Sequence, residues 1–565
     1  MLNSRKRTKT LETRLMIDEF SDYYADYLDG VYDCVDRIVL NAYYRMGCSP
    51  AGFRTWWRRL KGSDDQLNDT HLMRMAGRVS RRVRTYAEKN NIPVIDCRAG
   101  ERKHKIAERY LPTDPNFTGV FLILVHRAPA PIYQVKRSKN GKITNIAKKK
   151  PLSYVNHYSF HLIDSEWGHL TIKMCGHPPF SAQIMLNGHE YVSRRAQKQG
   201  LEFTKVGNCF TEIINARRLA IVAETSFCSD RIIGRLTQVC ERWIYSSCLC
   251  FALDLKEQQR TNFRYNYSVF QAEYSRNLLF ERGTEMDQVF QGVVNHTWTR
   301  LDVKRLRTIF GAKKRPSRTR KKKHPRLEVV VERPVYDLTV FKVHFGLITA
   351  KLYTKGERVL RIETIIHNTK ALHCKRSLEN FVEIISQLKS ILNRFLESLN
   401  CIDVSCIAET KLDEWPTPSQ LGQTRVAGID INNPRMRAVI EAIISLSAHP
   451  RGFTSSDIAD AVGVRLKTPD NDYTPRKAAY DLKKFRGKHL IRKIGKSRRY
   501  QTVPEGLKAM TALLILREKI IKPVLAGAGK PKPGPKPKNQ APIDKHFQII
   551  QSEMRNLFQV IGIAA

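Results

Sequence analysis

The sequence predicts an α+β protein of several domains, and three observations lead to that fold class. The chain has 565 residues, enough for about three or four domains. Apolar residues recur every three or four positions in some segments and alternate with polar residues in others. Two basic, proline-containing stretches, 311–326 and 526–542, interrupt these patterns and are expected to be linkers. The expected order is a helical N-terminal region with α/β elements, a central β-rich and helical body, and a C-terminal unit of helices and a hairpin.

The charge of the chain indicates a polyanionic partner. It contains 97 Lys and Arg against 54 Asp and Glu, a net charge of +43. A compact protein with this much positive charge repels itself unless a partner such as nucleic acid neutralises it. No run of about 18 apolar residues is present to span a bilayer, and the basic N-terminus lacks the apolar part of a secretory signal. We expect DNA as the partner, with RNA as the alternative, no membrane, and a cytoplasmic, nucleoid-associated protein.

Several common cofactor motifs are missing from the sequence. The 12 cysteines are scattered and include no Cys-x-x-Cys pair, so a zinc ribbon or zinc finger is not expected. The sequence also has no phosphate-binding Gly-x-x-x-x-Gly-Lys-Ser/Thr motif and no Gly-x-Gly-x-x-Gly after a strand. We therefore expect no chemistry driven by ATP or NAD, and no cofactor is certain.

Residues 1–90 are expected to be a helical region. FRTWWRRLKG (Phe53–Gly62) and HLMRMAGRVSRRVRTYAEK (His71–Lys89) carry apolar residues at a spacing of three to four, with arginines between them. Trp56 and Trp57 are expected to pack in the core.

Residues 91–230 are expected to form an α/β to β-rich domain. A short buried strand at 91–97, a helix at 99–111 and a second buried strand at 119–128 predict a βαβ unit. A lysine-rich hairpin or loop is expected around Asn140-Gly141, followed by short strands over 153–212.

Residues 231–310 are expected to be helical, and 327–400 to form β-hairpins plus a helix. Thr261–Phe280 interleaves aromatic residues with arginines, and we interpret it as the core-facing side of a helix, with stacking on unpaired bases as the alternative. Residues 326–368 alternate with period two, as strands do, and Ser377–Leu399 has a helical period. No internal repeat is evident. A short amphipathic helix is expected at 543–565.

Residues 435–525 form the last folded unit in this interpretation. Helices are expected at Arg435–His449 and Gly452–Gly463. Thr474 is placed to cap a third helix that has Pro475 at its first position and runs to about 488. Two short strands around 495–497 and a further helix follow.

Helix, helix, helix and a basic hairpin, in this order, resemble the winged helix-turn-helix family over residues 435–515. The matching segments are GFTSSDIADAVG and YTPRKAAYDLKKFRGKHLIRKIGKSRRYQTV. In that family the third helix enters the major groove and the wing contacts the DNA backbone. The resemblance implies that Thr474, Arg476, Lys477 and Tyr480 read bases and that Lys483, Lys484, Lys496, Arg498 and Arg499 contact phosphates.

Other basic residues outside this unit are further candidates for phosphate contacts. They occur beside the tryptophans, beside the aromatic run and in the first linker. These candidates are Arg58, Arg59, Arg264, Lys313, Lys314, Arg320 and Lys321.

A group of histidines is a candidate metal site. His157 and His161 lie four residues apart, so on a strand they face the same side, and His169 follows closely. Imidazoles that converge can hold a divalent metal and activate water in a nuclease. We therefore hold His157 and His161 as catalytic candidates, and all three as metal ligands. The alternative is that they are hydrogen-bonded within a polar β-region or lie against nucleic acid.

The stretch KLYTKGERVLRIETIIHN (Lys351–Asn368) faintly resembles rolling-circle replication initiators, in which Tyr-x-Lys-Gly precedes a strand that carries Arg-x-Glu. The matching residues are Tyr353, Lys355, Gly356, Arg361 and Glu363. The resemblance implies that Glu363 is catalytic and helps to hold Mg²⁺ or Mn²⁺, while a tyrosine attacks the phosphodiester. The alternative is an ordinary antiparallel hairpin with a surface Arg–Glu pair.

Together these observations favour a DNA-binding protein of a mobile genetic element. Two alternatives remain at this point: a metal-dependent nuclease or nickase, and an RNA-binding subunit of a ribonucleoprotein.

Overall fold

The computed structural model describes residues 18–300, 307–310, 327–335, 338–345, 347–372, 374–403, 414–449, 451–466 and 473–517, and residues 549, 550, 552, 553 and 556. They belong to two compact units. The first comprises residues 21–291 and 305–393, and the second 18–20, 292–304 and 394–565. The fold is of the mixed α+β kind that the sequence predicts. Both expected linkers, and most of the helix expected at 543–565, lie outside the described residues.

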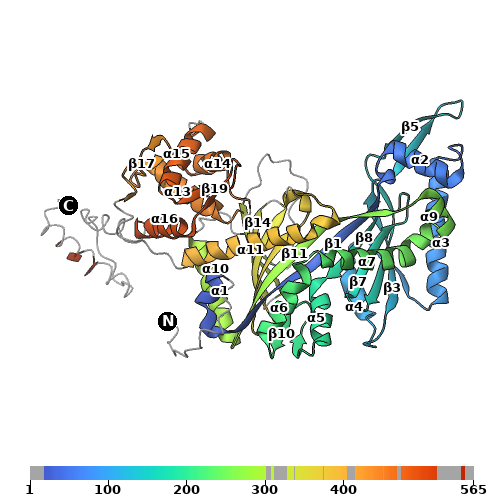
Figure 1. Cartoon of the computed structure of the whole chain (residues 1–565), viewed down its shortest axis with the longest axis horizontal. Helices are drawn as coiled ribbons and strands as arrows, with labels where there is room; N and C mark the ends of the chain where they lie inside the picture. The colour runs from blue at the N-terminus through green and yellow to red at the C-terminus, as the bar shows by residue number, and fades with distance from the viewer. Residues whose placement is uncertain are drawn as a thin grey trace, which may run out of the picture. The chain divides into compact units, whose positions relative to one another are not determined.

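One large mixed sheet forms the centre of the first unit (Figure 1). Its strands are β1 (Leu28–Tyr44), β2 (Val94–Asp96), β3 (Gly119–Ala130), β6 (Ser153–Asp164), β7 (Gly168–Cys175), β8 (Ala182–Asn187), β11 (Tyr265–Phe280), β12 (Arg307–Phe310), β13 (Leu327–Val335), β14 (Leu338–Phe345), β15 (Ile348–Lys355) and β16 (Val359–Ile366). Their order across the sheet is β12-β13-β14-β15-β16-β11-β1-β8-β7-β6-β3-β2. The long strands β1 and β11 lie side by side and antiparallel at its centre.

The sheet consists of two halves with the same topology. In each half the first strand of the chain lies at the centre and pairs antiparallel with the last one, β8 or β16. The remaining strands follow outward in reverse chain order, and each half ends in a parallel pair, β2 with β3 or β12 with β13. The expectation that the chain has no internal repeat was therefore wrong at the level of topology.

The two central strands are where the sequence-based prediction fails. β1 lies in the region expected to be helical at 1–90, and β11 lies in the one expected at 231–310. The pairing of the two strands shifts register between Val35 and Ile38 and again between Val39 and Leu40. Each β-bulge interrupts the alternation of apolar and polar positions, so the period of two is lost from the sequence.

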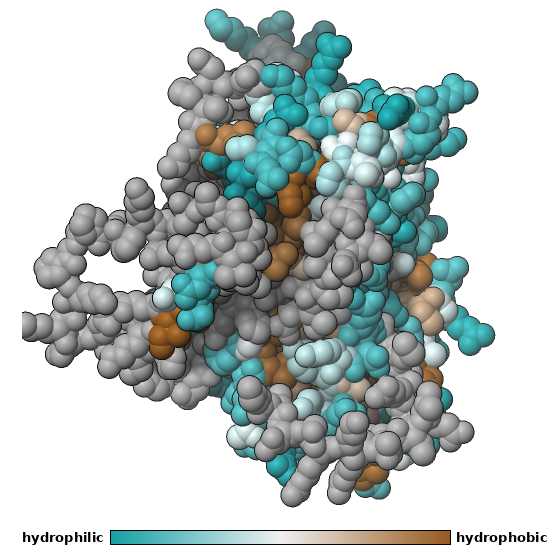
Figure 2. Space-filling model, turned by 90° about the vertical axis from the view of Figure 1, so that its left-hand side faces the viewer, coloured by the Kyte–Doolittle hydropathy of each residue, from teal (hydrophilic) through white to brown (hydrophobic). Residues whose placement is uncertain are grey.

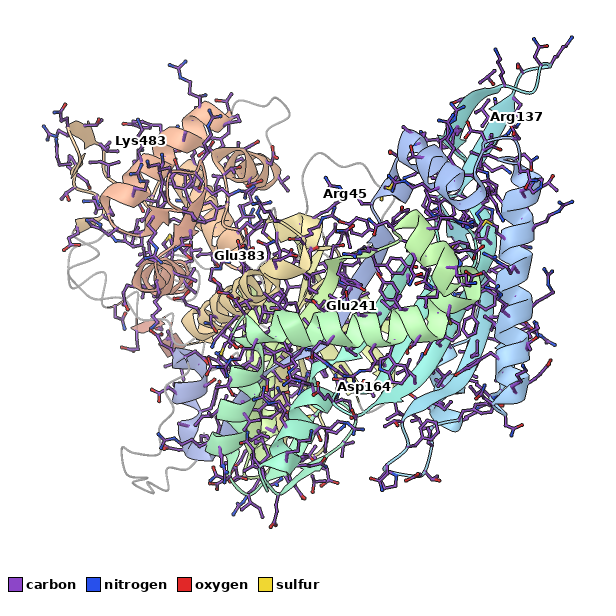
Figure 3. All side chains as sticks on the ribbon, turned by 45° about the vertical axis from the view of Figure 1, so that its right-hand side comes forward. Arg45, Arg137, Asp164, Glu241, Glu383 and Lys483 are labelled. Carbon is purple, nitrogen blue, oxygen red and sulfur yellow. The ribbon has the colours of Figure 1, made fainter. Side chains whose placement is uncertain are left out.

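Other local predictions in the first unit are confirmed. The βαβ unit consists of β2, α4 (Lys103–Arg109) and β3, with the two strands parallel. The expected hairpin is β4 (Tyr133–Arg137) with β5 (Ile143–Lys148). Helices α2 (Pro50–Lys61) and α3 (Asp69–Lys89) lie where helical spacing predicts them. Figure 3 shows Arg137 in the hairpin, and its guanidinium donates to the Leu67 carbonyl at 3.1 Å.

The first half of the sheet has an apolar face and a polar face. Leu40, Ile172 and Ile184 are fully buried, and α5 (Gly188–Lys198) and α6 (Ala216–Phe227) pack against β1. The neighbouring positions Asn41, Lys173 and Gln183 are directly opposite one another on β1, β7 and β8, and all are half-exposed. We call this second side of the sheet the polar face. An antiparallel sheet with one face packed and one face open is expected to alternate in this way.

The second unit contains each element that the sequence predicts between residues 434 and 516. They are α13 (Pro434–Ser447), α14 (Ser455–Leu466), α15 (Pro475–Gly487), the strands β19 (Ile491–Lys493) and β20 (Tyr500–Thr502), and α16 (Pro504–Leu516). Apolar residues of all four helices form one core. A short hairpin, β17 (Ser419–Leu421) with β18 (Thr424–Val426), packs against α15 and was not expected.

Candidate nucleic-acid interface

Helix α15 presents opposite chemistry on its two sides. The Thr474 hydroxyl accepts a hydrogen bond from the Lys477 amide at 3.4 Å, and Pro475 is the first helical residue, as expected. Leu482 and Phe485 face the core and are fully buried. The outward side is left to polar and basic residues, and Figure 3 places Lys483 on this helix.

Most of the predicted DNA-contacting residues of this unit are exposed. They come from the first two turns of α15, from its outer side, and from the turn between β19 and β20. The exposed candidates are Thr474, Arg476, Lys477, Tyr480, Lys483, Lys496 and Arg498.

Two of the residues predicted to contact phosphates are less accessible than the others of this unit. Lys484 is only 8% exposed; its Nζ lies 3.5 Å from an Asp481 carboxylate oxygen and 5.3 Å from the centre of the Tyr480 ring. Arg499 is half-buried and donates to the Gly452 carbonyl at 3.1 Å, so it ties the hairpin to the loop before α14. Both side chains stabilise the unit instead of facing solvent.

The basic candidates of the first unit differ in whether an acidic side chain already pairs with them. Arg58 is exposed, but its Nη2 donates to the Asp64 carboxylate at 2.6 Å, which partly neutralises its charge. Arg59 and Arg264 are exposed. Trp56 and Trp57 are fully buried, so their expected packing is confirmed. The remaining candidates, Lys313, Lys314, Arg320 and Lys321, lie outside the described residues.

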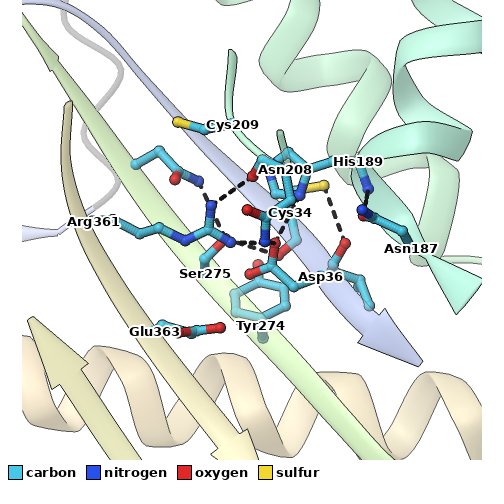
Figure 4. A network of polar contacts seen from close by, with 12 residues as sticks. Cys34, Asp36, Asn187, His189, Asn208, Cys209, Tyr274, Ser275, Arg361 and Glu363 are labelled. Carbon is cyan, nitrogen blue, oxygen red and sulfur yellow. Dashed lines mark hydrogen bonds and ion pairs between the residues drawn. The ribbon is translucent and has the colours of Figure 1, made fainter. Parts of the chain in front are cut away.

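A buried ionic network connects β1 and β16 across the strand β11 that lies between them (Figure 4). Asp36 and Arg361, both fully buried, form an ion pair, and His189 Nδ1 lies 2.7 Å from an Asp36 carboxylate oxygen. Arg361 Nη1 donates to the Asn208 carbonyl at 2.6 Å. Burial opposes ionisation of Asp36, but Arg361 and His189 outweigh it and hold its pKa well below the usual range.

Glu363 belongs to the same side of β16 as Arg361. Both are buried, so the alternative of a surface Arg–Glu pair is wrong. Lys351, directly opposite on β15, lies 3.0 Å from Glu363, and the Tyr353 hydroxyl lies 3.4 Å from it. Burial works against the Glu363 carboxylate, but Lys351 and then Arg361 lower its pKa. Burial, and next the charge of Glu363, raise the pKa of nearby Glu273 to about 7.

The Tyr353 hydroxyl and the Glu363 carboxylate of this network are poorly suited to the predicted nickase chemistry. A phosphodiester is attacked by a deprotonated or activated tyrosine. Burial raises the pKa of the Tyr353 hydroxyl well above its ordinary value, and Glu363 raises it further. The carboxylate of Glu363 is already paired with Lys351. Gly356 lies in the β15–β16 turn with φ +63°, a conformation that glycine adopts without strain.

The predicted metal ligands form separate pairs. His161 Nδ1 lies 3.3 Å from His169 Nε2, whereas the His157 ring stacks on His126 at 5.8 Å. Glu363 lies in the other half of the sheet. Among the residues that the structure describes, no three His, Cys, Asp or Glu side chains form a group able to hold a metal. Burial lowers the pKa of His157 and His161 to about 4, so both are neutral at pH 7.

A hollow on the polar face was missed by the sequence analysis. It has a volume of about 820 Å³ and opens beside β1, β7 and β8. Its basic lining residues come from two strands and from the segment after β16; they are His157, Lys173, Lys375 and Arg376. We call it the basic hollow. No motif marks it, because its residues meet only when the sheet forms.

Where residues are described, the side in Figure 2 is mainly hydrophilic, with hydrophobic residues in small, separate areas. In the part of the chain that the structure describes, none of the helices has the length and apolar character that a membrane crossing requires. No protein-family model, curated protein or solved structure matches this chain.

Proposed function

We propose that this protein binds DNA through helix α15 and the β19–β20 turn of its second unit. The order of three helices, a two-stranded hairpin and a further helix resembles that of a winged helix-turn-helix domain, in which the third helix reads the major groove, and this resemblance supports the proposal. One observation carries the proposal: the basic residues of α15 and of the turn are exposed on the outside while the apolar ones form the core.

The positions of the exposed residues suggest how the contacts divide. Arg476, Lys477 and Tyr480 follow the capped N-terminus of α15, the part of a recognition helix that enters the groove deepest. Their side chains are long enough to reach base edges, and arginine and lysine pair with guanine. Lys496 and Arg498, in the hairpin turn, suit phosphate contacts that do not depend on sequence.

The large net charge supports DNA as the partner of the whole chain. An excess of 43 positive charges exceeds what one domain needs, so further backbone contacts by the first unit are part of the proposal. The DNA of a mobile element, such as its ends or origin, is the target that we propose for a large binder of this kind.

A selection experiment with the full-length chain tests this function. Duplexes recovered from a random library should share a motif, and Arg476→Ala with Lys477→Ala should weaken binding to that motif by about 5- to 150-fold for each lost base contact. Arg84→Ala is the control, because Asp96 already holds that guanidinium and Arg84 is not among the candidate contacts. If the double variant and the parent chain bind the motif equally well, α15 is not the recognition helix.

The same duplexes should be incubated with Mg²⁺ and with Mn²⁺. We expect the DNA to stay intact, since the described residues contain no group of metal ligands. A nick at the selected motif would support the nickase alternative instead.

A further inference from the structure

The basic hollow is unusual because its central lysine lies beside no acid. Lys173 is half-exposed on β7, and its cross-strand neighbour is the neutral Gln183, whose amide donates to Asn41 Oδ1 at 2.8 Å. On β15, by contrast, Lys351 lies 3.0 Å from Glu363. Within the described residues, no carboxylate forms a salt bridge with Lys173, and none lines the hollow. A partly desolvated cation without a counterion is costly.

Further positive charge gathers around Lys173. Burial lowers its pKa, and the charge of Lys103 from α4 lowers it further. Burial likewise lowers the pKa of His157, and the charge of Lys173 adds to that effect. Lys375 and Arg376 reach the rim from the segment after β16. Lys173 therefore lies within the field of Lys103, and Lys375 and Arg376 add two further cations to the lining, whereas His157 is neutral at pH 7.

The backbone holds the rim in place. The amide of Val269, on β11, donates to the Arg376 carbonyl at 2.8 Å. Ser268 and Ser377 form an isolated β-bridge directly beside it. Lys375 and Arg376 are thus carried by a segment bound to the central strand and not by a free loop end. The backbone that carries these two side chains is therefore already ordered, which lowers the entropy cost of binding a ligand.

We propose that the basic hollow binds a phosphate monoester, and that this phosphate belongs to the 5′ end of a nucleic-acid strand. A monoester carries more charge than a backbone phosphodiester, which suits a hollow lined by Lys173, Lys375 and Arg376. A volume of about 820 Å³ exceeds the needs of a phosphate and leaves room for a nucleoside. Tyr43, Pro129 and Pro131 provide apolar walls, and Asn41 provides an amide. The choice of nucleic acid rests on the proposed function, whereas the phosphate site does not.

The test compares single-stranded oligonucleotides that differ only at their 5′ end. Each carries a 3′ fluorophore and either a 5′-phosphate or a 5′-hydroxyl, and the anisotropy of the full-length chain is measured at one salt concentration. We expect the phosphorylated strand to bind about tenfold more tightly. Lys173→Gln should abolish this preference, and the exposed Lys198→Gln, which removes the same charge outside the hollow, should retain it. No preference in the parent chain, or the same preference in Lys173→Gln, overturns the proposal.

Two additions keep the test decisive. If melting shows that Lys173→Gln does not fold, Arg376→Gln at the rim takes its place, with the same expected loss. A 5′-mononucleotide added as competitor separates the sources: displacement of the oligonucleotide shows that free nucleotides also enter, and no displacement restricts the site to strand ends. The variant with Arg476→Ala and Lys477→Ala should keep the 5′-phosphate preference, so the two proposals can fail independently.

Discussion

Asp36 and Arg361 form a buried ion pair although β11 lies between the strands that carry them. The pair spans the line where the two halves of the sheet join, because Asp36 belongs to the first half and Arg361 to the second. His189, on the helix that follows β8, contacts Asp36 as well. The halves are therefore held together by charge as well as by the pairing of β1 with β11.

Removing one member of this pair should destabilise the first unit strongly. Asp36→Ala leaves Arg361 charged and without its main counterion inside the protein, a loss of about 3–5 kcal/mol in the free energy of unfolding. The matched control is Asp96→Ala, which breaks the ion pair between Asp96 and Arg84. The Arg84 side chain is 48% exposed and that of Asp96 65%, so this variant should change the free energy of unfolding far less. Urea denaturation followed by tryptophan fluorescence measures both. Similar losses in the two variants would contradict a structural role for the network.

The raised pKa of Glu273 predicts that one substitution stabilises the protein at high pH only. Its pKa is about 7 in the folded chain against about 4.5 when unfolded, so the folded state binds the proton more tightly. Protonated Glu273 therefore contributes stability that is fully present below about pH 4.5 and is lost as the pH rises to about 7 and above. Glu273→Gln should raise stability at pH 8 by about 1–2 kcal/mol, allowing for the partial exposure of the side chain, and change little at pH 4. Denaturation curves at the two pH values show the difference.

The histidines of β6 should make the fold sensitive to acid. The pKa of His161 is lowered to about 4 by burial and then by His169, so the unfolded chain binds this proton more readily. The stability that neutral His161 contributes is present above pH 6.5 and is lost as the pH falls to about 4. His161→Gln should therefore reduce the drop in melting temperature between pH 7 and pH 5. The same substitution at exposed His104 should leave that drop unchanged.

Two adjacent lysines of α15 should behave differently. Exposed Lys483→Ala should weaken DNA binding and reduce the slope of log affinity against log salt by about one, as the loss of one phosphate contact does. Buried Lys484→Ala should leave that slope unchanged and instead lower the melting temperature, because it removes contacts with Asp481 and the Tyr480 ring. Binding measured at several salt concentrations, together with melting curves, separates the two effects. Equal salt slopes for both variants would place the DNA elsewhere.

Elements whose signals are local could be predicted from the sequence. The Thr474 cap, Pro475 and the spacing of the apolar residues placed α15 correctly, because each of these signals acts within a turn or two of helix. The βαβ unit and the hairpin at Asn140-Gly141 were found for the same reason. β1 and β11 were missed because bulges hide their alternation and because their partners lie far away in the chain; Asp33 and Arg276, which are hydrogen-bonded, are 243 positions apart.

By itself, the sequence determined the excess of positive charge, the mixed α+β class and the local elements of the second unit, since these depend on composition and short-range periodicity. Only the tertiary structure decided which charges are free. Lys483 and Lys484 are neighbours of one type in the chain, yet one is exposed and the other is buried against Asp481. Likewise, Lys351 lies opposite Glu363 on the neighbouring strand, whereas Lys173 lies opposite Gln183. The register of the strands determines these cross-strand neighbours, and the sequence around each lysine does not.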